Sequence, residues 1–455
     1  MSDLSSPELA AKVHALMPQL QRDLEDLVRI PSISGDGMPA EPIQAGHDAV
    51  AELLRGAGVE KVWTLELPDT NPIVMGEIPA PPGAPTVLLY SHYDVVPAGD
   101  LEEWDTDPFE PVTKNGAIYG RGSADTKSNI MAHVGALRAW DGKPPVGIKI
   151  VIEGQEEVGG GALTPYPPTN PELFWADVMI IGDMGSVSPG IPTLTVALRG
   201  MCEVTFEVRT LASAKHSGQY GGAAPDALVA LVQALATLHD EHGNVAVEGL
   251  RREEWTGGGS SEDEFYALAE VQGDLPLIGT GNLGSRVWSG PAITIVGIDV
   301  PSVDGAVNAV SPYARAKLNI RVHPEQDAAE AQAAVIAHLQ QTKPFGIGFT
   351  VSGGATGNGF AARTESLAYD AARESWQATW EADVVKVGVG GSIPLVNALQ
   401  QAAPEADMLL VGATDGYANI HGPNERVLLD EFEKATLAEA DFLGRFAAAY
   451  ARAQA

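Results

Sequence analysis

The chain has little cysteine, few basic residues and no long apolar run. Cys202 is the one cysteine among 455 residues, which excludes an intrachain disulfide framework and indicates a reducing compartment. Lys and Arg number 28 against 60 Asp and Glu, so the formal charge is -32, and a field of this sign repels nucleic acid and anionic lipid. Because the sequence also lacks a signal-peptide pattern and a membrane-length apolar run, we expect a soluble, cytoplasmic protein without nucleic-acid or membrane partners.

What the chain does contain is enough apolar sequence for two or three domains, with 45% hydrophobic residues. Leu and Val recur at helical spacing between Leu9 and Leu27, and Ile30-Pro31 ends the pattern, which predicts an amphipathic opening helix. Continuous apolar runs occur at residues 86–90, 148–152, 178–181 and 408–411. Such runs are typical of a mostly parallel sheet that helices cover on both faces, and we expect those helices at 129–140 and 365–380.

Between about residues 199 and 354 the pattern changes to strict alternation, at 202–209 and again at 314–322. Alternation predicts a sheet with one wet face, whose dry face helices at 224–239 and 326–341 could cover, before a final strand near 347–351. Residues 255–261 and 279–290 are interpreted as long surface loops. The predicted fold is therefore α/β: a mostly parallel-sheet domain made of residues 1–198 and 355–455, with an α+β domain, residues 199–354, inserted into it.

Charged side chains and imidazoles follow the predicted buried strands. They are His92 and Asp94, Glu156 and Glu157, Asp183, and His421, and Asp125 lies in a glycine-bounded turn. Ligand sites in open α/β sheets collect at the carboxyl ends of strands. Two imidazoles and three carboxylates (His92, Asp125, Glu157, Asp183 and His421) are the nitrogen and oxygen ligands that two divalent ions need.

The other two residues of this set are expected to do different work. Asp94 would orient His92, since the two side chains share one face of a strand end. Glu156 would take a proton from metal-activated water and pass it to the leaving amine. Simpler interpretations stay open at this point: a plain hydrogen bond for His92 and Asp94, and a helix N-cap for Asp125.

Further glycine-rich segments and histidines are less specific. Residues 388–394 partly fit a dinucleotide loop but carry Pro394 at its final position, and a backbone cradle for a substrate carboxylate around Gly391 fits better. His133 and His323 are interpreted as ordinary core or surface histidines. His216 lies in a glycine-rich stretch that could be either a functional loop or a bland turn.

As a set, these motifs resemble the M20 metallopeptidases, most closely their dipeptidase branch, over about residues 24–425. The resemblance implies that Asp125 bridges two metals, that His92 and Asp183 bind one and Glu157 and His421 the other, and that Glu156 is the general base. It implies that the inserted domain is a lid that forms a homodimer, through which His216 of a partner subunit stabilises the oxyanion. It also implies that Asn308, Arg321 and Ser392 hold the substrate, beside the backbone cradle proposed around Gly391. Gly388 and Val389 depart from the Arg-Glu of many members, and Gly422-Pro423 from the usual Ser-Gln of the carnosine type.

The sequence thus predicts a hydrolase with two divalent ions per subunit that cleaves the amide bond of dipeptides or small peptides. Zinc is the expected metal, with manganese or cobalt as alternatives. An N-acyl amino acid amidohydrolase on the same scaffold is the second hypothesis. A metal-dependent peptide-binding protein without catalysis is the third, and the presence of Glu156, which no ligand count requires, argues against it.

Overall fold

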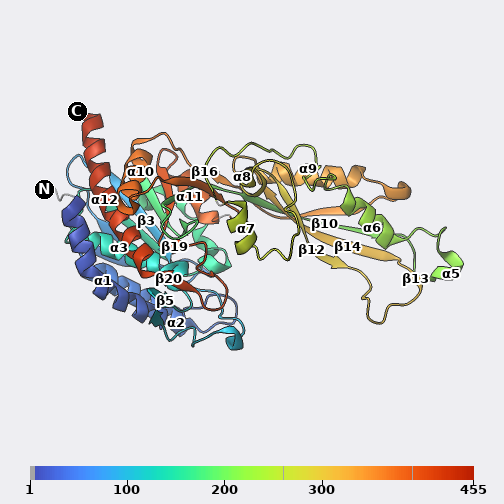
Figure 1. The fold of residues 1–455 in the computed structure, drawn as a ribbon, viewed down its shortest axis with the longest axis horizontal. Helices are drawn as coiled ribbons and strands as arrows, with labels where there is room; N and C mark the ends of the chain where they lie inside the picture. The colour runs from blue at the N-terminus through green and yellow to red at the C-terminus, as the bar shows by residue number, and fades with distance from the viewer. Residues whose placement is uncertain (1–5, 260, 392) are drawn as a thin grey trace. The chain divides into compact units, whose positions relative to one another are not determined.

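The computed structural model describes residues 6–259, 261–391 and 393–455 (Figure 1). They form two compact units: residues 6–196, 362–386 and 394–455 make the first, and Ala197–Ala361 with Val387–Ile393 make the second. The stretch Val387–Ile393, which the predicted boundaries assign to the catalytic domain, belongs to the second unit. In the described part of the chain, no helix is both long and apolar enough to cross a membrane.

A mostly parallel sheet forms the centre of the first unit. The four predicted apolar runs are its strands β6 (Gly147–Glu153), β3 (Thr86–His92), β7 (Val178–Gly182) and β18 (Asp407–Val411), which lie side by side in this order and run parallel. Antiparallel strands β2 (Ile73–Ile78) and β1 (Lys61–Leu65) continue the sheet beyond β6. All of β7 and nearly all of β3 is buried, so both faces are covered. The parallel order places four carboxyl ends at one edge.

Helices of the first unit share one hydrophobic core with this sheet; they are α1 (Ser6–Val28), α2 (Ala40–Gly56), α3 (Ser128–Ala139), α10 (Leu367–Trp380) and α12 (Leu429–Gln454). The opening helix, α1, buries the predicted stripe, including Leu9, Leu20 and Leu24. Smaller elements are β4 (Val112–Lys114), β5 (Ala117–Tyr119), β20 (Arg426–Leu428), β8 (Gly185–Ser186), β19 (Thr414–Asp415), α4 (Pro171–Phe174) and α11 (Pro394–Ala402). Strands β9 (Thr193–Leu198) and β17 (Val385–Val389) run across points where the chain passes between the units.

The second unit is built on a four-stranded antiparallel sheet with one buried face. Its order is β12 (Ala292–Asp299), β14 (Tyr313–Val322), β10 (Gly200–Arg209) and β15 (Thr350–Gly357). In β10 the buried side chains alternate from Cys202 to Val208, as predicted. Helices α6 (Ala227–Ala236) and α9 (Ala328–Gln341) pack on this dry face. The predicted fold class, a mostly parallel α/β sheet with an inserted α+β domain, is therefore confirmed.

Two local predictions in the second unit differ from the structure. The predicted strand near residues 347–351 is present as β15, but it starts at Thr350, and a short strand β16 (Phe360–Ala361) follows it. The segment 279–290 is not all loop, because it contains helix α8 (Leu283–Val287), whose cap Asn282 accepts a hydrogen bond from the N–H of Ser285. The dense glycines on either side of α8 masked this cap signal in the sequence.

Candidate functional site

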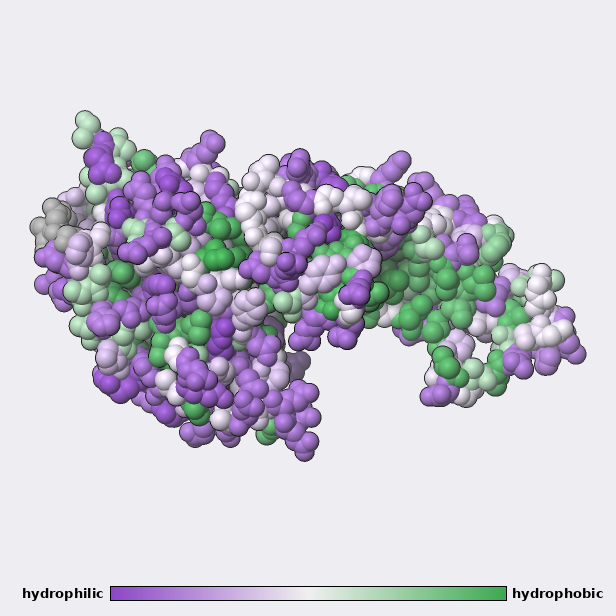
Figure 2. Space-filling view, viewed as in Figure 1, coloured by the Kyte–Doolittle hydropathy of each residue, from purple (hydrophilic) through white to green (hydrophobic). Residues whose placement is uncertain are grey.

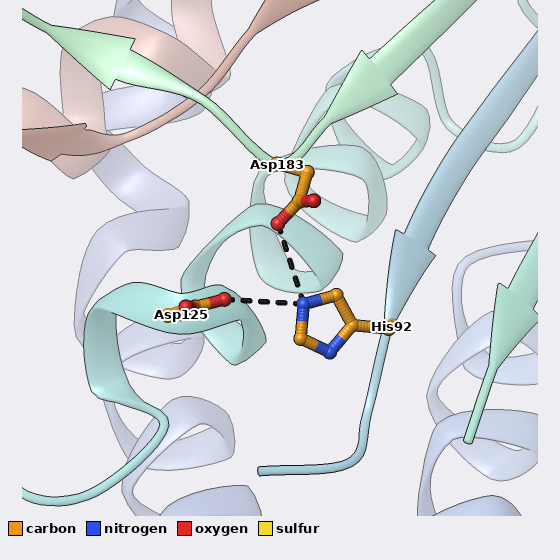
Figure 3. A group of neighbouring side chains, drawn as sticks. All are labelled: His92, Asp125 and Asp183. Carbon is orange, nitrogen blue, oxygen red and sulfur yellow. Dashed lines mark hydrogen bonds and ion pairs between the residues drawn. The ribbon is translucent and has the colours of Figure 1, made fainter. Parts of the chain in front are cut away.

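His92 ends β3, and its two ring nitrogens face different partners. Nδ1 lies 3.0 Å from the backbone oxygen of Asp94 and 3.3 Å from its carboxylate, so it must carry a proton to make these contacts. Nε2 lies 3.1 Å from Asp125 and 3.3 Å from Asp183, whose side chains both point at this nitrogen (Figure 3). A ring that donates through one nitrogen to a carboxylate or carbonyl presents the other nitrogen to a cation.

Asp125 divides its two oxygens between two histidines. Oδ1 faces His92, and Oδ2 lies 3.1 Å from Nε2 of His421, which is also 3.0 Å from Oε2 of Glu157. Asp125 is thus shared by two groups of three, His92 with Asp183 and His421 with Glu157, within each of which the ligand atoms lie within 4.8 Å of one another. Ligands about 2.0–2.2 Å from a tetrahedral ion lie roughly 3.3–3.6 Å apart, so this spacing suits one ion per group.

The turn before α3 carries Asp125, but Asp125 is not a helix cap. The N-cap of α3 is Lys127, and no side chain caps it. Gly122 has φ 81°, and a Cβ there would lie 2.6 Å from Val95. Glycine is therefore required where the chain passes Val95, which lies just after β3.

The adjacent glutamates lie on a single 3-10 turn, Glu156–Val158, directly after β6. The backbone N–H groups of Glu156 and Glu157 each donate to one oxygen of Asp94 at 3.1 Å. Among the described residues, Oε1 of Glu157 is buried without a hydrogen-bond partner, which fits a side chain that receives a cation. Glu156 belongs to neither ligand group.

Burial and the close spacing of carboxylates shift the pKa values of four residues in the site. Burial, reinforced by Asp183, raises the pKa of Glu156 to about 8, and burial raises the pKa of Asp183 to about 6. Contacts with Asp125 and Glu157 raise the pKa of His421 to about 10. Burial also acts to raise the pKa of Asp125, but hydrogen bonds from His421 and His92 outweigh it and hold that pKa far below its ordinary value. A divalent cation bound to each group would displace the protons of Asp183 and His421 and relieve the repulsion between the carboxylates.

The predicted substrate residues of the second unit fall into two places. His216, on β11 (Lys215–His216), pairs with Ala309 of β13 (Ala309–Val310), and Ser217 donates its N–H to the backbone of Asn308 at 2.9 Å, so His216 and Asn308 are neighbours. Arg321 lies near the other end of β14, which begins at Tyr313 beside this corner (Figure 1). Eight residues of strand span about 26 Å. The structure therefore brings His216 and Asn308 together but not Arg321.

The glycine-rich segment 388–394 has one glycine with a packing role. A Cβ on Gly388 would lie 2.6 Å from the Trp288 side chain, so no larger residue fits there. Gly391 is exposed, and no heavy atom lies within 4 Å of a Cβ built on it, which is compatible with the cradle hypothesis. Ser392 lies outside the described residues.

Several buried residues near the site carry no role in the sequence interpretation. Glu425 accepts four hydrogen bonds from Arg121 and the Asp125 turn, and Glu153 accepts the Tyr90 hydroxyl at 2.6 Å. Glu425 stands in the same short motif as His421, which was the signal available. His133 is a buried core histidine, which is one of the two predicted alternatives, and it pairs with Glu439.

A third acidic and imidazole group lies in the second unit and is already satisfied. Arg251 pairs with both Glu253 and Glu325, at 2.5 and 3.0 Å. Nδ1 of His323 accepts the N–H of Glu325, so Nε2 carries the proton and faces Glu253. A cation there would have to displace both the arginine and that proton.

Comparisons with known proteins identify the family of this chain. The family model described as "Peptidase family M20/M25/M40" matches residues 88–445 of this chain. A cysteinylglycine-S-conjugate dipeptidase of Corynebacterium striatum is 42% identical over 367 residues, which covers 79% of this chain and 81% of the relative. A Beta-Ala-His dipeptidase of Rattus norvegicus is 28% identical, over 82% of this chain and 80% of the relative.

Among solved structures, the di-peptidase Dug1p of Saccharomyces cerevisiae superposes with a TM-score of 0.79 at 23% identity, covering 98% of this chain and 99% of the other. Human carnosine dipeptidase 1 gives a TM-score of 0.77 at 23% identity, with 97% and 99% covered. These likenesses show the shared fold. The predicted resemblance to the dipeptidase branch is confirmed, and the chain is an enzyme that belongs to peptidase family M20/M25/M40.

Proposed function

We propose that this chain is a dipeptidase that uses two divalent metal ions, one in each ligand group, with zinc as the expected metal. The observation that carries the proposal is Asp125, whose two oxygens face His92 and His421 and so join the two groups. The orphaned Oε1 of Glu157 supports it, because a buried carboxylate oxygen without a donor suits a cation. The carboxylates of Asp125, Glu157 and Asp183 supply three negative charges against the four positive charges of two divalent ions, and one further anion would complete the balance.

When bound, two divalent ions would acidify a water molecule and polarise the scissile carbonyl. Glu156 is left free for proton transfer because its backbone is held by Asp94 while its side chain belongs to neither ligand group. Its carboxylate would accept the proton of the attacking water and deliver it to the leaving amine. Burial favours the neutral form of Glu156, which suits the second of these steps.

The substrate class we propose is a dipeptide of the cysteinylglycine type, including its S-conjugates. The support is the 42% identity to the cysteinylglycine-S-conjugate dipeptidase. The substrate carboxylate needs a different anchor from the arginine that many family members have at the position of Gly388. That arginine would not fit here, because Trp288 fills the space that a side chain at position 388 would need. Arg321 and the backbone of Gly391 are the groups we assign to the substrate carboxylate.

We further propose that a homodimer completes the site through the second unit. An extended dipeptide spans only about 7 Å, so Arg321 and the His216–Asn308 corner, about 26 Å apart along β14, do not meet on one substrate within a chain. A partner subunit would supply His216 and Asn308. The edge strand β12 exposes Ile295, Val296 and Ile298, and Figure 2 shows hydrophobic surface over this unit. Such a surface suits a second copy of the chain.

The test is a substrate panel on metal-stripped protein reloaded with zinc, manganese or cobalt. Cys-Gly, an S-alkyl Cys-Gly, β-Ala-His, N-acetyl amino acids and N-succinyl amino acids would be compared by kcat/KM, with metal content measured on the same samples. We expect two ions per chain and the fastest turnover with Cys-Gly or its S-conjugate. Preference for the N-acyl amino acids would establish the amidohydrolase hypothesis instead, and hydrolysis without metal would overturn the proposal.

A further inference from the structure

Glu425 places a fully buried carboxylate inside the turn that carries Asp125. Its Oε1 accepts the backbone N–H of Ala124 at 2.9 Å and of Asp125 at 3.0 Å. Its Oε2 accepts the N–H of Gly122 at 3.0 Å and Nη1 of Arg121 at 2.6 Å. Three main-chain donors and one guanidinium converge on one carboxylate, which therefore fixes the path of the chain up to Asp125.

The same residue belongs to the segment that carries His421. Arg121, which binds the Glu425 carboxylate, also donates through Nη2 to the backbone oxygen of His421 at 3.3 Å. The backbone oxygen of Glu425 accepts the N–H of Gly120 at 2.9 Å. His421 has φ 62° and a side chain that is 53% exposed, so packing around the ring does not hold it in place. The position of the His421 ring depends on the main chain that Arg121 and Glu425 fix.

We propose that Glu425 is a positioning residue that holds Asp125 and His421 at the spacing the second ligand group needs. The inference rests on the proposed metal site. The first group, His92 with Asp125 and Asp183, draws two members from the ends of neighbouring parallel strands β3 and β7. The second group, Asp125 with Glu157 and His421, draws its members from turns and loops. Loss of Glu425 should therefore weaken the second group more than the first.

Glu431 provides a matched control for the simple loss of a buried carboxylate. It lies in the first unit, is 2% exposed, and accepts the N–H of Gly190 at 2.7 Å and Nε1 of Trp380 at 3.2 Å. Its partners lie outside the Asp125 and His421 segments. Glu431→Gln removes a carboxylate of the same kind and size without touching the proposed ligands.

The experiment titrates metal-stripped wild type, Glu425→Gln and Glu431→Gln with zinc in competition with a chromophoric chelator, which resolves the number and affinity of sites. The amide introduced by Glu425→Gln must turn an NH₂ group toward either Arg121 and Gly122 or Ala124 and Asp125. We expect Glu425→Gln to keep the first site and to bind the second ion about 10- to 100-fold more weakly, the range seen when outer partners of metal ligands are removed. Glu431→Gln should bind both ions as wild type does. Excess zinc should restore Glu425→Gln activity.

Hydrogen exchange of the metal-free proteins gives a readout that is independent of metal. The amides of Gly122, Ala124 and Asp125 should exchange faster in Glu425→Gln than in wild type or Glu431→Gln. Unchanged zinc affinities in Glu425→Gln, or equal weakening of both sites, would overturn the positioning role. If wild type failed to bind two ions, the proposed function would fail, while the exchange data would still decide whether Glu425 orders the turn.

A second variant covers the case in which Glu425→Gln does not fold. Arg121→Lys keeps one positive charge beside Glu425 but cannot donate to both Glu425 and His421 in the fork geometry of a guanidinium. We expect it to weaken the second zinc selectively as well. A folded Arg121→Lys protein with both affinities unchanged would count against the proposal.

Discussion

Oδ2 of Asp94 accepts the backbone N–H of Glu157 at 3.1 Å. Oδ1 of Asp94 accepts the N–H of Glu156 at 3.1 Å and lies 3.3 Å from Nδ1 of His92. One fully buried carboxylate thus orients the ring of a proposed metal ligand and fixes the turn that carries the proposed general base. Its position links the carboxyl ends of β3 and β6.

Asp94→Asn should impair metal binding and catalysis together. The substitution preserves size but places an NH₂ group against one of two main-chain donors or against His92, since an amide cannot accept from all three. We expect metal affinity to fall about 10- to 100-fold and kcat/KM to fall with it. Asp177→Asn is the control, because Asp177 accepts the N–H of Thr86 at the opposite end of β3. Equal effects of the two variants would show that only general destabilisation is involved.

Glu156 and Glu157 should fail in different ways, because the first is assigned to proton transfer and the second to metal. Glu156→Gln should abolish turnover by removing the proton acceptor, with metal content near two per chain. Glu157→Gln should lose the second ion as well as activity. Metal analysis of both purified variants, beside kcat, separates the roles. Substantial turnover by Glu156→Gln would remove the general-base assignment.

Much of the first unit could be predicted because its strands have a distinctive pattern. Continuous apolar runs identified β3, β6, β7 and β18, and each is followed by residues that now lie together at one edge of the sheet. The register of parallel strands brings these ends together without any further information. The same argument could not show that Glu425 lies beneath the Asp125 turn, because that contact joins residues 300 positions apart through loops.

The second unit shows where sequence patterns fail. Alternation located β10 and β14 and their dry face, whereas α8 was missed because glycines surround it. The separation of Arg321 from His216 also needed the structure. It follows from the direction of β14 and the pairing of β11 with β13, which no local pattern encodes.

Arg321 should bind the substrate carboxylate, and Arg315 offers a control on the same strand. Both side chains project from the solvent-facing side of β14, but Arg315 pairs with Asp299. Arg321→Met should reduce kcat/KM by an amount that corresponds to about 1.5–3 kcal/mol, the value of a hydrogen bond to a charged group. Arg315→Met should have little effect. If wild type hydrolysed free and C-terminally amidated dipeptides equally well, Arg321 would have no carboxylate to bind.

Stability should depend on pH through the buried pair of His133 and Glu439, whose atoms Nδ1 and Oε2 lie 2.8 Å apart. Burial lowers the pKa of His133, but Glu439 outweighs it and the net pKa lies above the ordinary value. A raised folded-state pKa means that the stabilisation is complete below the unfolded pKa of about 6.5 and is lost as pH rises through the folded pKa. The difference in unfolding free energy between wild type and His133→Gln, measured in urea, should therefore shrink above neutral pH.

His14→Gln is the control for this measurement, since His14 pairs with Glu433 while its side chain is 80% exposed. Its difference from wild type should be small at every pH. A His133→Gln difference that stayed constant from acid to alkaline pH would mean that the pair contributes no proton-linked stability.

Mixed dimers test whether His216 acts across the proposed subunit interface. Glu156→Gln and His216→Ala chains should each be inactive as homodimers, because one lacks the proton acceptor and the other the proposed oxyanion donor. A mixed dimer keeps one complete site, which joins Glu156 of one chain to His216 of the other. Random pairing of equal amounts should restore about a quarter of wild-type activity, since half of the dimers are mixed and each has one intact site of two. Co-expressed chains with different tags allow the mixed species to be purified and assayed. Inactive mixed dimers of verified composition would show that His216 does not serve the partner's site, whereas recovery would place the oxyanion donor on the second subunit.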